Sequence, residues 1–444
     1  MHRPSFVSLG VALSIVSGCG DNTGGGSSGA GTTADPGTDA TTGSGTVAGE
    51  DSTASGAPTG AGTGSGGGPT TGDVTTTDGG TEAGTAGSSE TGTDTGVEPG
   101  SDLDTALGCP GVYNPDQILD LHLEMAPGDW QTVKGDLSFS IYVEAQFHCG
   151  DEAPLTVGVR RKRSGGTHKV GLKVDFNKFV MGQRWQDLRK LSLENGVSSG
   201  DPDDDAEVRD LVGEYLGWRV MQRAGVIASR AAFSNLYVNQ ELIGVYVDVE
   251  QVDTRFLKDR FGDNDGWLVK KSGGDGDGPQ THEDDGMADP FAAYFCFWGK
   301  GGQACDPPAD DVLLAELPGK LDIVQFLRFG AANAYIANTD GPLFKDNNWY
   351  YYDWSGGGRA YMPTDLDTTM KSFTNVLTPD GHAFDTVLFT HWMPDYEAIL
   401  TEIVEVQAPA SVMLEELDRV LMVAGPALDG DPWANGTTAA AVAT

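Results

Sequence analysis

Apolar and polar residues alternate in short runs along the middle of the chain, which is the pattern of strands with one buried face. In the run HKVGLKVDF, the apolar residues share one face, while Lys169 and Lys173 share the other. The small-residue turn SGGT joins this run to the preceding one, so the two runs predict a hairpin. Similar runs predict strands at 117–125, 141–149, 153–164, 231–239, 242–250, 347–354 and 359–365.

Longer stretches carry apolar residues three and four positions apart and predict helices. The first, 201–225, starts in a run of acids and ends at Gly225, as the helix dipole and the usual helix end favour. This mixture of strands and helices predicts an α+β domain at 109–430, followed by a loose tail at 431–444. Further helices are predicted at 253–261, 320–338, 395–407 and 411–425.

The region before this domain has a different composition. Residues 20–108 contain 13 Asp or Glu and no Lys or Arg, and they hold almost no large apolar side chain. A segment of this kind cannot bury a core, so we expect a disordered linker at 20–108. The net charge of the whole chain is −37, which disfavours nucleic acid and anionic membrane surfaces as partners.

The extreme N-terminus has the features of an export signal. Arg3 precedes the apolar run FVSLGVALSIVSG, which is too short to span a bilayer. The run ends at Val16–Cys19, which resembles the lipobox of bacterial lipoproteins. This resemblance implies a signal peptide at 1–19 and a lipid on Cys19 that anchors the protein in the bacterial cell envelope, facing the periplasm or the outer surface. The alternative is an ordinary signal peptide with an incidental cysteine.

Four cysteines remain if Cys19 carries a lipid. An even number in an exported protein predicts two disulfide bonds, for which three pairings exist. The short loop between Cys296 and Cys305 favours that pair, which leaves Cys109 to pair with Cys149. A zinc site is the competing interpretation, although the spacing fits no common zinc finger.

Candidate chemistry is concentrated at the end of the last predicted strand. In PTDLDTT, Asp365 and Asp367 lie two positions apart, so they face the same way if the strand continues. Two carboxylates this close repel each other unless a cation lies between them. A hard divalent cation such as Mg²⁺ or Mn²⁺ prefers these oxygen ligands. The alternatives are residues that cap the next turn, a structural Ca²⁺ site, or the D-x-D of a metal-dependent glycosyltransferase.

The order of the predicted parts is that of a protein kinase: a hairpin with lysines, a long helix, a second hairpin, an apolar helix ending in Asp, and a last hairpin ending in Asp. The chain also resembles the CotH family of atypical, secretory-type protein kinases. The resemblance runs from about residue 121 to about residue 370 and implies a two-lobed, kinase-like α+β fold. It depends on the segments RKLSLENG, EVRDLVGEYLGWRVMQRAGV, LYVNQELIGVYVDVEQVDTRFL and NTDGPLFKDNNWYYYDWSGGGRAYMPTDLDTT.

The resemblance implies transfer of a phosphoryl group from ATP, with Mg²⁺ or Mn²⁺, to Ser or Thr of exported or surface proteins. It gives a role to each of several residues. Asp340 would act in catalysis. Lys169 or Lys173 would contact the nucleotide phosphates, with Glu207 or Glu214 as the helix partner of that lysine, and Glu250 would lie at the adenine. Asn347 or Asn348, together with Asp365 or Asp367, would hold the metal.

Some features depart from this pattern. The usual kinase loop places Asn five residues after the catalytic Asp, but position 345 here is Lys345. Taken singly, each candidate residue also has an ordinary structural explanation, such as a turn, a helix cap or a solvated strand face. The alternative function is therefore a catalytically inactive surface protein of kinase-like fold that binds partners or Ca²⁺. The acidic pieces near Asp263 and Asp275 are consistent with Ca²⁺ but lack the terminal Glu of an EF-hand loop.

Overall fold

The structure is a computed structural model of the chain, and it contains two sheets and a set of helices. The predicted signal peptide, Cys19 and the linker lie outside the described residues, and so do Glu207, Asp263, Asp275, Cys109, Cys296 and Cys305. Cys149 is disulfide-bonded. Because the other cysteines lie outside the described residues, both pairings stay predictions. The described residues are 111–163, 165–196, 210–262, 264–271, 280–284, 310–343, 347–354, 358–370 and 383–433.

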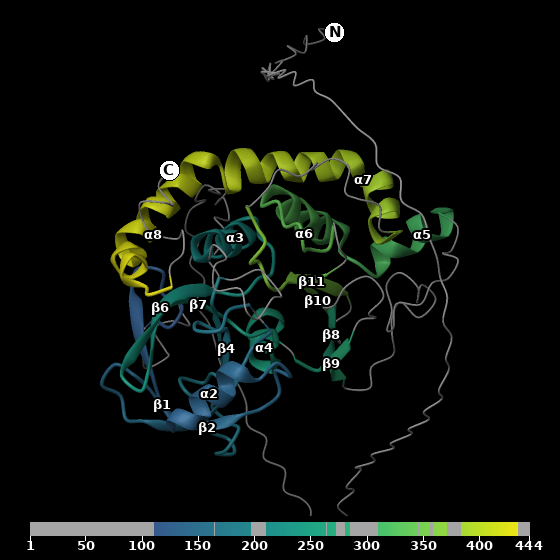
Figure 1. Cartoon of the computed structure of the whole chain (residues 1–444). Helices are drawn as coiled ribbons and strands as arrows, with labels where there is room; N and C mark the ends of the chain where they lie inside the picture. The colour runs from purple at the N-terminus through teal and green to yellow at the C-terminus, as the bar shows by residue number, and fades with distance from the viewer. Residues whose placement is uncertain are drawn as a thin grey trace, which may run out of the picture. The chain divides into compact units, whose positions relative to one another are not determined.

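The first half of these residues forms a closed barrel in the order β1-β2-β3-β4-β5-β7-β6 (Figure 1). Neighbouring strands are antiparallel except for β1 and β6, which are parallel. Alternate side chains fill the interior, as the predicted alternation requires. The strands are β1 (Ile118–Glu124), β2 (Val143–Cys149), β3 (Leu155–Arg161), β4 (Leu172–Asp175), β5 (Lys190–Glu194), β6 (Ala231–Val238) and β7 (Glu241–Val249).

Helix α2 (Pro127–Gly135) packs against β2 and β3. Its buried residues Trp130 and Val133 belong to the same apolar cluster as the barrel interior. Helix α2 therefore closes part of the barrel.

A second, four-stranded sheet has the order β11-β10-β8-β9. Its strands are antiparallel, and the hairpin of β10 and β11 was predicted. Strands β5, β8 and β9 do not correspond to any predicted strand. The strands of this sheet are β8 (Gly266–Lys271), β9 (Gln280–Asp284), β10 (Trp349–Trp354) and β11 (Arg359–Pro363).

Helices α3, α6, α7 and α8 share one apolar core with the outer face of β6 and β7 and with the second sheet, whereas α4 packs in a separate apolar cluster with β8, β10 and β11. In the view of Figure 1, α7 and α8 follow one another above α3 and α6. None of the helices in the described part of the chain is both long and apolar enough to cross a membrane. The helices are α3 (Leu211–Arg223), α4 (Thr254–Phe261), α5 (Asp310–Glu316), α6 (Ile323–Tyr335), α7 (Ala383–Glu402) and α8 (Ala410–Gly430), with a 3-10 turn η2 (Leu317–Gly319) and a π-helical segment η3 (Ile403–Gln407).

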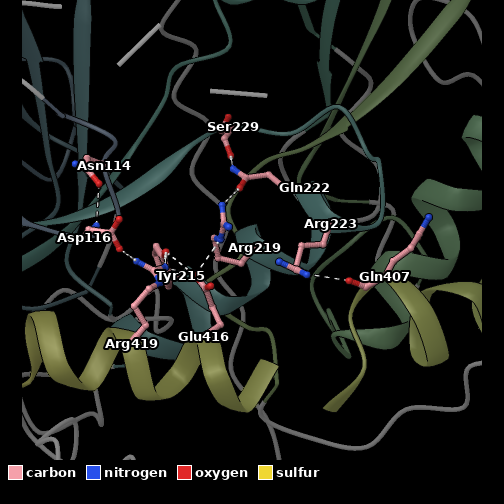
Figure 2. Close-up of polar contacts among 10 residues, drawn as sticks. All are labelled: Asn114, Asp116, Tyr215, Arg219, Gln222, Arg223, Ser229, Gln407, Glu416 and Arg419. Carbon is pink, nitrogen blue, oxygen red and sulfur yellow. Dashed lines mark hydrogen bonds and ion pairs between the residues drawn. The ribbon is translucent and has the colours of Figure 1, made fainter. Parts of the chain in front are cut away.

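Polar contacts attach α8 to α3 (Figure 2). The carboxylate of Glu416 accepts hydrogen bonds from Tyr215 Oη at 2.9 Å and from Arg219 Nε at 3.0 Å. Arg419 contacts the same carboxylate and also pairs with Asp116 at 3.1 Å. These bonds join the last helix both to α3 and to the segment that leads into the barrel.

Several boundaries differ from the sequence predictions, and three of them bear on the site or on the extent of the domain. Helix α3 begins at Leu211 because the side chain of Asp210 accepts a hydrogen bond from Gly213 N at 2.7 Å and caps it. Strand β4 begins at Leu172, so Lys169 lies in the turn and not on the strand. The packed domain continues past residue 430, because Asp431 is buried.

Candidate active site

Asp340 lies shortly after the end of α6 and is the centre of a small polar group. Asn348 Nδ2 donates to Asp340 Oδ2 at 2.8 Å, and Asn347 Nδ2 donates to the same oxygen at 3.2 Å. The loop is anchored by Asn338, which is fully buried and donates to Asn333 Oδ1 on α6 at 2.9 Å. The structure therefore brings together three of the predicted site residues.

The hairpin of β10 and β11 places Asn348 beside the aspartate that follows β11. Thr364 N donates to Asn348 O at 3.0 Å across the hairpin. Asn348 and Asp365 both adopt left-handed backbone, with φ of 59° and 56°. Asn and Asp adopt this conformation more readily than most other residues, so both positions beside the hairpin suit them.

The segment after β11 packs on α3. Thr369 Oγ1 donates to Leu366 O at 2.8 Å and lies 3.3 Å from Gly213 O. Gly217 permits this approach, because a Cβ at that position would lie 2.9 Å from Thr369 Oγ1. The contact brings Asp365 and Asp367 toward α3.

Glu214 on α3 faces these two aspartates. Its side chain is 1% exposed, and neither carboxylate oxygen has a hydrogen-bond partner among the described residues. Burial raises the pKa of Glu214 well above its ordinary value, and the carboxylates of Glu194, Asp365 and Asp367 raise it further. Glu214 is therefore a buried carboxyl group that lies among other carboxylates and has no hydrogen-bond partner within the described residues.

Lys162 links this carboxylate group to the barrel. It follows β3 directly, and its ammonium forms an ion pair with Glu194 at the end of β5. Burial acts to lower the pKa of Lys162, but Glu194, Asp365 and Glu214 outweigh it and raise the pKa. Lys162 is thus a cation shared by carboxylates from β5, α3 and the segment after β11.

Two further lysines lie near Lys162. Lys173 on β4 donates to Gln251 Oε1, just after β7. Lys270 on β8 lies over the ring of Tyr350, with 5.4 Å between its Nζ and the ring centroid. Burial lowers the pKa of both lysines, and the charge of Lys162 lowers them further. An anion bound near these three lysines would favour their charged forms.

Asp365 lies between the lysines and the acids. Burial raises its pKa; Lys162 and Lys270 act against this, while Glu194 and Asp340 act with it. The charges that act on Asp365 come from the barrel, from β8 and from the loop after α6. These parts of the chain therefore converge on one site.

Two predicted site residues lie elsewhere. Lys169 is fully buried and its ammonium pairs with Asp431 at 2.6 Å, so it does not reach the lysine group. Glu250 is buried and pairs with Arg230 at 2.8 Å and with Arg260 at 2.6 Å. Because two guanidinium groups occupy its carboxylate, Glu250 holds the end of β7 in place and does not face a ligand.

Sequence reasoning did not single out Lys162, Glu194 or Lys270. Glu194 lies in RKLSLENG, which contributed to the family resemblance without a role for its acid. Lys162 lies in the basic run RRKRSGG, in which the sequence does not distinguish it from the neighbouring arginines. Nothing in the sequence pointed to Lys270, because β8 was not predicted as a strand.

A divalent cation fits this site only with help from other oxygen ligands. Within the described ranges, no group of three or more His, Cys, Asp or Glu side chains is arranged to hold a metal ion. The unsatisfied carboxylate of Glu214 and the raised pKa of Asp365 nevertheless show an excess of negative charge. Asn348 donates through Nδ2, which leaves its amide oxygen for a cation. Amide, carboxylate and phosphate oxygens together make the usual environment of Mg²⁺.

A family model described as CotH kinase protein matches residues 162–408, more than half of the 444 residues. The chain belongs to the CotH kinase family. No curated protein matches it. The CotH match begins at Lys162 and includes every member of the site described above, from Lys162 to Asp367. Membership in a kinase family implies ATP and a divalent metal in general terms.

Proposed function

We propose that this CotH protein transfers the γ-phosphoryl group of ATP to Ser or Thr hydroxyls of exported or surface proteins. One observation carries the proposal. The charges of Lys162, Asp365 and Glu214 act on one another although they come from the barrel, from the end of β11 and from α3. Phosphoryl transfer needs such an arrangement, with cations for the phosphates next to carboxylates for a metal.

The lysines neutralise the phosphates in this proposal. Lys162, held by Glu194, and Lys173, held by Gln251, are fixed in position before ATP binds. A lysine that is already oriented loses little additional conformational entropy when phosphate binds. The barrel and the helical part of the domain then act as the two lobes of a kinase-like fold, with ATP between them.

Asp340 orients the acceptor hydroxyl and takes its proton. The hydroxyl oxygen forms a bond to the γ-phosphorus, the bond from that phosphorus to the ADP oxygen breaks, and the proton moves to Asp340 Oδ1 or Oδ2. The amide groups of Asn347 and Asn348 fix the carboxylate orientation through their bonds to Oδ2. Asn348 and Asp365, with Asn347 or Asp367, would hold Mg²⁺ or Mn²⁺, which supplies positive charge to the phosphates.

The test is transfer of label from γ-labelled ATP to envelope proteins by the purified full chain. Asp340→Asn should abolish transfer and retain the thermal shift with Mn²⁺ and ATP, because the base is lost but the nucleotide site is kept. Asp395→Asn, at an exposed position on α7, is the matched control and should match the parent. Equal labelling by Asp340→Asn and the parent contradicts the mechanism. A parent that neither labels nor shifts supports the inactive surface protein instead.

We also propose that Cys19 carries a lipid and that the domain works in the cell envelope. The proposal is supported by the apolar N-terminus and the small residues that precede this cysteine. Replacement of Cys19 by Ala should move the protein from the membrane fraction to the soluble fraction. Unchanged fractionation would contradict the lipid anchor.

A further inference from the structure

A pocket of about 360 Å³ lies beside α2, where β3 ends. Its volume is within the range of about 300–1,000 Å³ that is typical of small-molecule sites, and barrel mouths are among their usual locations. The candidate active site does not include it. The pocket is lined by Gln131, Lys134, Gly135, Leu137, Arg161, Thr167 and His168.

The alternation of β3 separates this pocket from the active site. Val157 and Val159 are fully buried in the barrel interior, and Arg161 continues the same face with an exposure of 1%. The side chain of Lys162, the next residue, points in the opposite direction, toward its ion-pair partner Glu194. The pocket and the candidate active site therefore lie on opposite faces of the same hairpin.

Two permanent positive charges line the pocket. Arg161 Nη2 donates to Gly166 O at 2.8 Å and Nη1 donates to Lys134 O, so the guanidinium is fixed in place. A guanidinium is charged at any accessible pH. The ammonium of Lys134 lies 5.6 Å from the ring centroid of Trp130, and within the described part of the chain no carboxylate forms an ion pair with it.

Two acids that neighbour pocket residues, Asp136 next to Gly135 in the chain and Asp431 close to Trp433, form their bonds with other groups. Both carboxylate oxygens of Asp136 accept backbone hydrogen bonds, from Ser138 N at 2.9 Å, from Ser140 N at 2.9 Å and from Ile141 N at 2.8 Å. Asp431 pairs with Lys169. The pocket lining contains two basic side chains and a histidine but no acid, although the chain has a net charge of −37.

We propose that this pocket binds a phosphate monoester. Two cationic side chains, Arg161 and Lys134, match the charge of about −1.5 to −2 that such a group carries at neutral pH. The amide of Gln131, the hydroxyl of Thr167 and the ring of His168 supply further polar groups, and Leu137 supplies an apolar wall for a small organic body. The ring of His168 is positioned by stacking on Trp433, with 4.3 Å between the ring centroids.

Calorimetric titration of the full chain tests the proposal with inorganic phosphate, O-phosphoserine and glycerol 3-phosphate as probes. Lys134→Glu and His168→Ala should each weaken binding by about ten-fold or more, equivalent to about 1.4 kcal/mol. Lys258→Glu, an exposed lysine on α4, is the matched control and should bind like the parent. Tighter binding of O-phosphoserine than of glycerol 3-phosphate points to a phosphorylated protein as the source, and the reverse order points to a free metabolite.

The active site could also bind phosphate, so the same titration is repeated with Lys173→Met. That variant should lose the thermal shift with Mn²⁺ and ATP and keep the phosphate affinity of the pocket. The proposal is wrong if Lys134→Glu binds the probes like the parent, if Lys173→Met abolishes their binding, or if no probe binds saturably at millimolar concentration. None of these outcomes depends on phosphoryl transfer, so the pocket and the kinase activity can fail separately.

Discussion

The ammonium of Lys162 forms an ion pair with the carboxylate of Glu194 and thereby joins the end of β3 to the end of β5. Ser192 Oγ donates to the same carboxylate oxygen at 2.9 Å. The pair lies beside Asp365 and Glu214, so it connects the barrel with the acids of the helical part. It is the structural basis of the first prediction.

Lys162→Met should lower phosphoryl transfer by about 10²–10³-fold, the usual effect of removing one preorganised electrostatic group. Glu194→Gln should have a smaller effect, because the lysine remains but loses its orientation. Steady-state kinetics with labelled ATP measures both variants, and Lys258→Met serves as control. Transfer by Lys162→Met within a factor of about two of the parent would remove this lysine from the mechanism.

Glu214→Gln should stabilise the protein without ligand and weaken its response to metal and nucleotide. The substitution keeps the side-chain volume and removes a buried carboxyl group whose charged form is disfavoured by burial and by the neighbouring carboxylates. A gain of about 0.5–2 kcal/mol in the free energy of unfolding is expected, at a cost in function. Urea unfolding and thermal shifts with Mn²⁺ and ATP measure the two effects. A variant that is less stable than the parent and shifts normally would show that Glu214 is structural.

The pairs of Glu250 predict a loss of stability in acid. Burial acts to raise the pKa of Glu250, but Arg230 and Arg260 outweigh it and hold the pKa below the ordinary value of 4.5. A carboxyl group whose pKa is lower in the folded state stabilises the fold above the unfolded pKa. This stabilisation is therefore complete near neutral pH and is lost as the pH falls below about 4.5 toward the folded pKa.

Glu250→Gln should cost about 3–5 kcal/mol near neutral pH, because it leaves two buried guanidinium groups without their partner. It should also reduce the slope of stability against pH below 4.5, since the group that titrates is gone. Urea unfolding at a series of pH values measures both effects. Asp259→Asn, at an exposed position on α4, should leave the slope close to that of the parent. Parallel pH profiles for Glu250→Gln and the parent would contradict the assignment.

Lys169 and Asp431 are predicted to act on stability and not on catalysis. Asp431 also accepts a hydrogen bond from Val245 N at 2.8 Å. Residue 244 is a glycine, and a Cβ there would lie 2.7 Å from the carboxylate oxygens of Asp431. Lys169→Met and Asp431→Asn should each cost about 3–5 kcal/mol, and the double variant should cost less than the sum. Urea unfolding gives the coupling energy. Additive losses, or unchanged stability with a raised KM for ATP, would instead return Lys169 to the active site.

The sequence alone determined whether most segments are helices or strands, and the order in which the candidate acids follow one another along the chain. Alternation marked the strands of the barrel other than β5, and the β10–β11 hairpin, because side chains on a strand point to opposite faces in turn. Helical spacing marked α3, α6 and α8, although α3 begins at Leu211 rather than at residue 201. The predicted site residues Asp340, Asn348 and Asp365 also lie near one another in the fold, because one loop and one hairpin hold them together.

Only the tertiary structure decided which charges meet. Lys169 and Lys173 share a face in an ideal strand, but the strand begins at Leu172, so Lys169 turns to Asp431 and Lys162 takes its place near the acids. Glu250 ends a predicted hairpin as expected, yet Arg230 and Arg260 occupy its carboxylate. The physical reason is that the periodicity of a sequence fixes the face on which a side chain lies, whereas its partner depends on strand order and on contacts between distant segments.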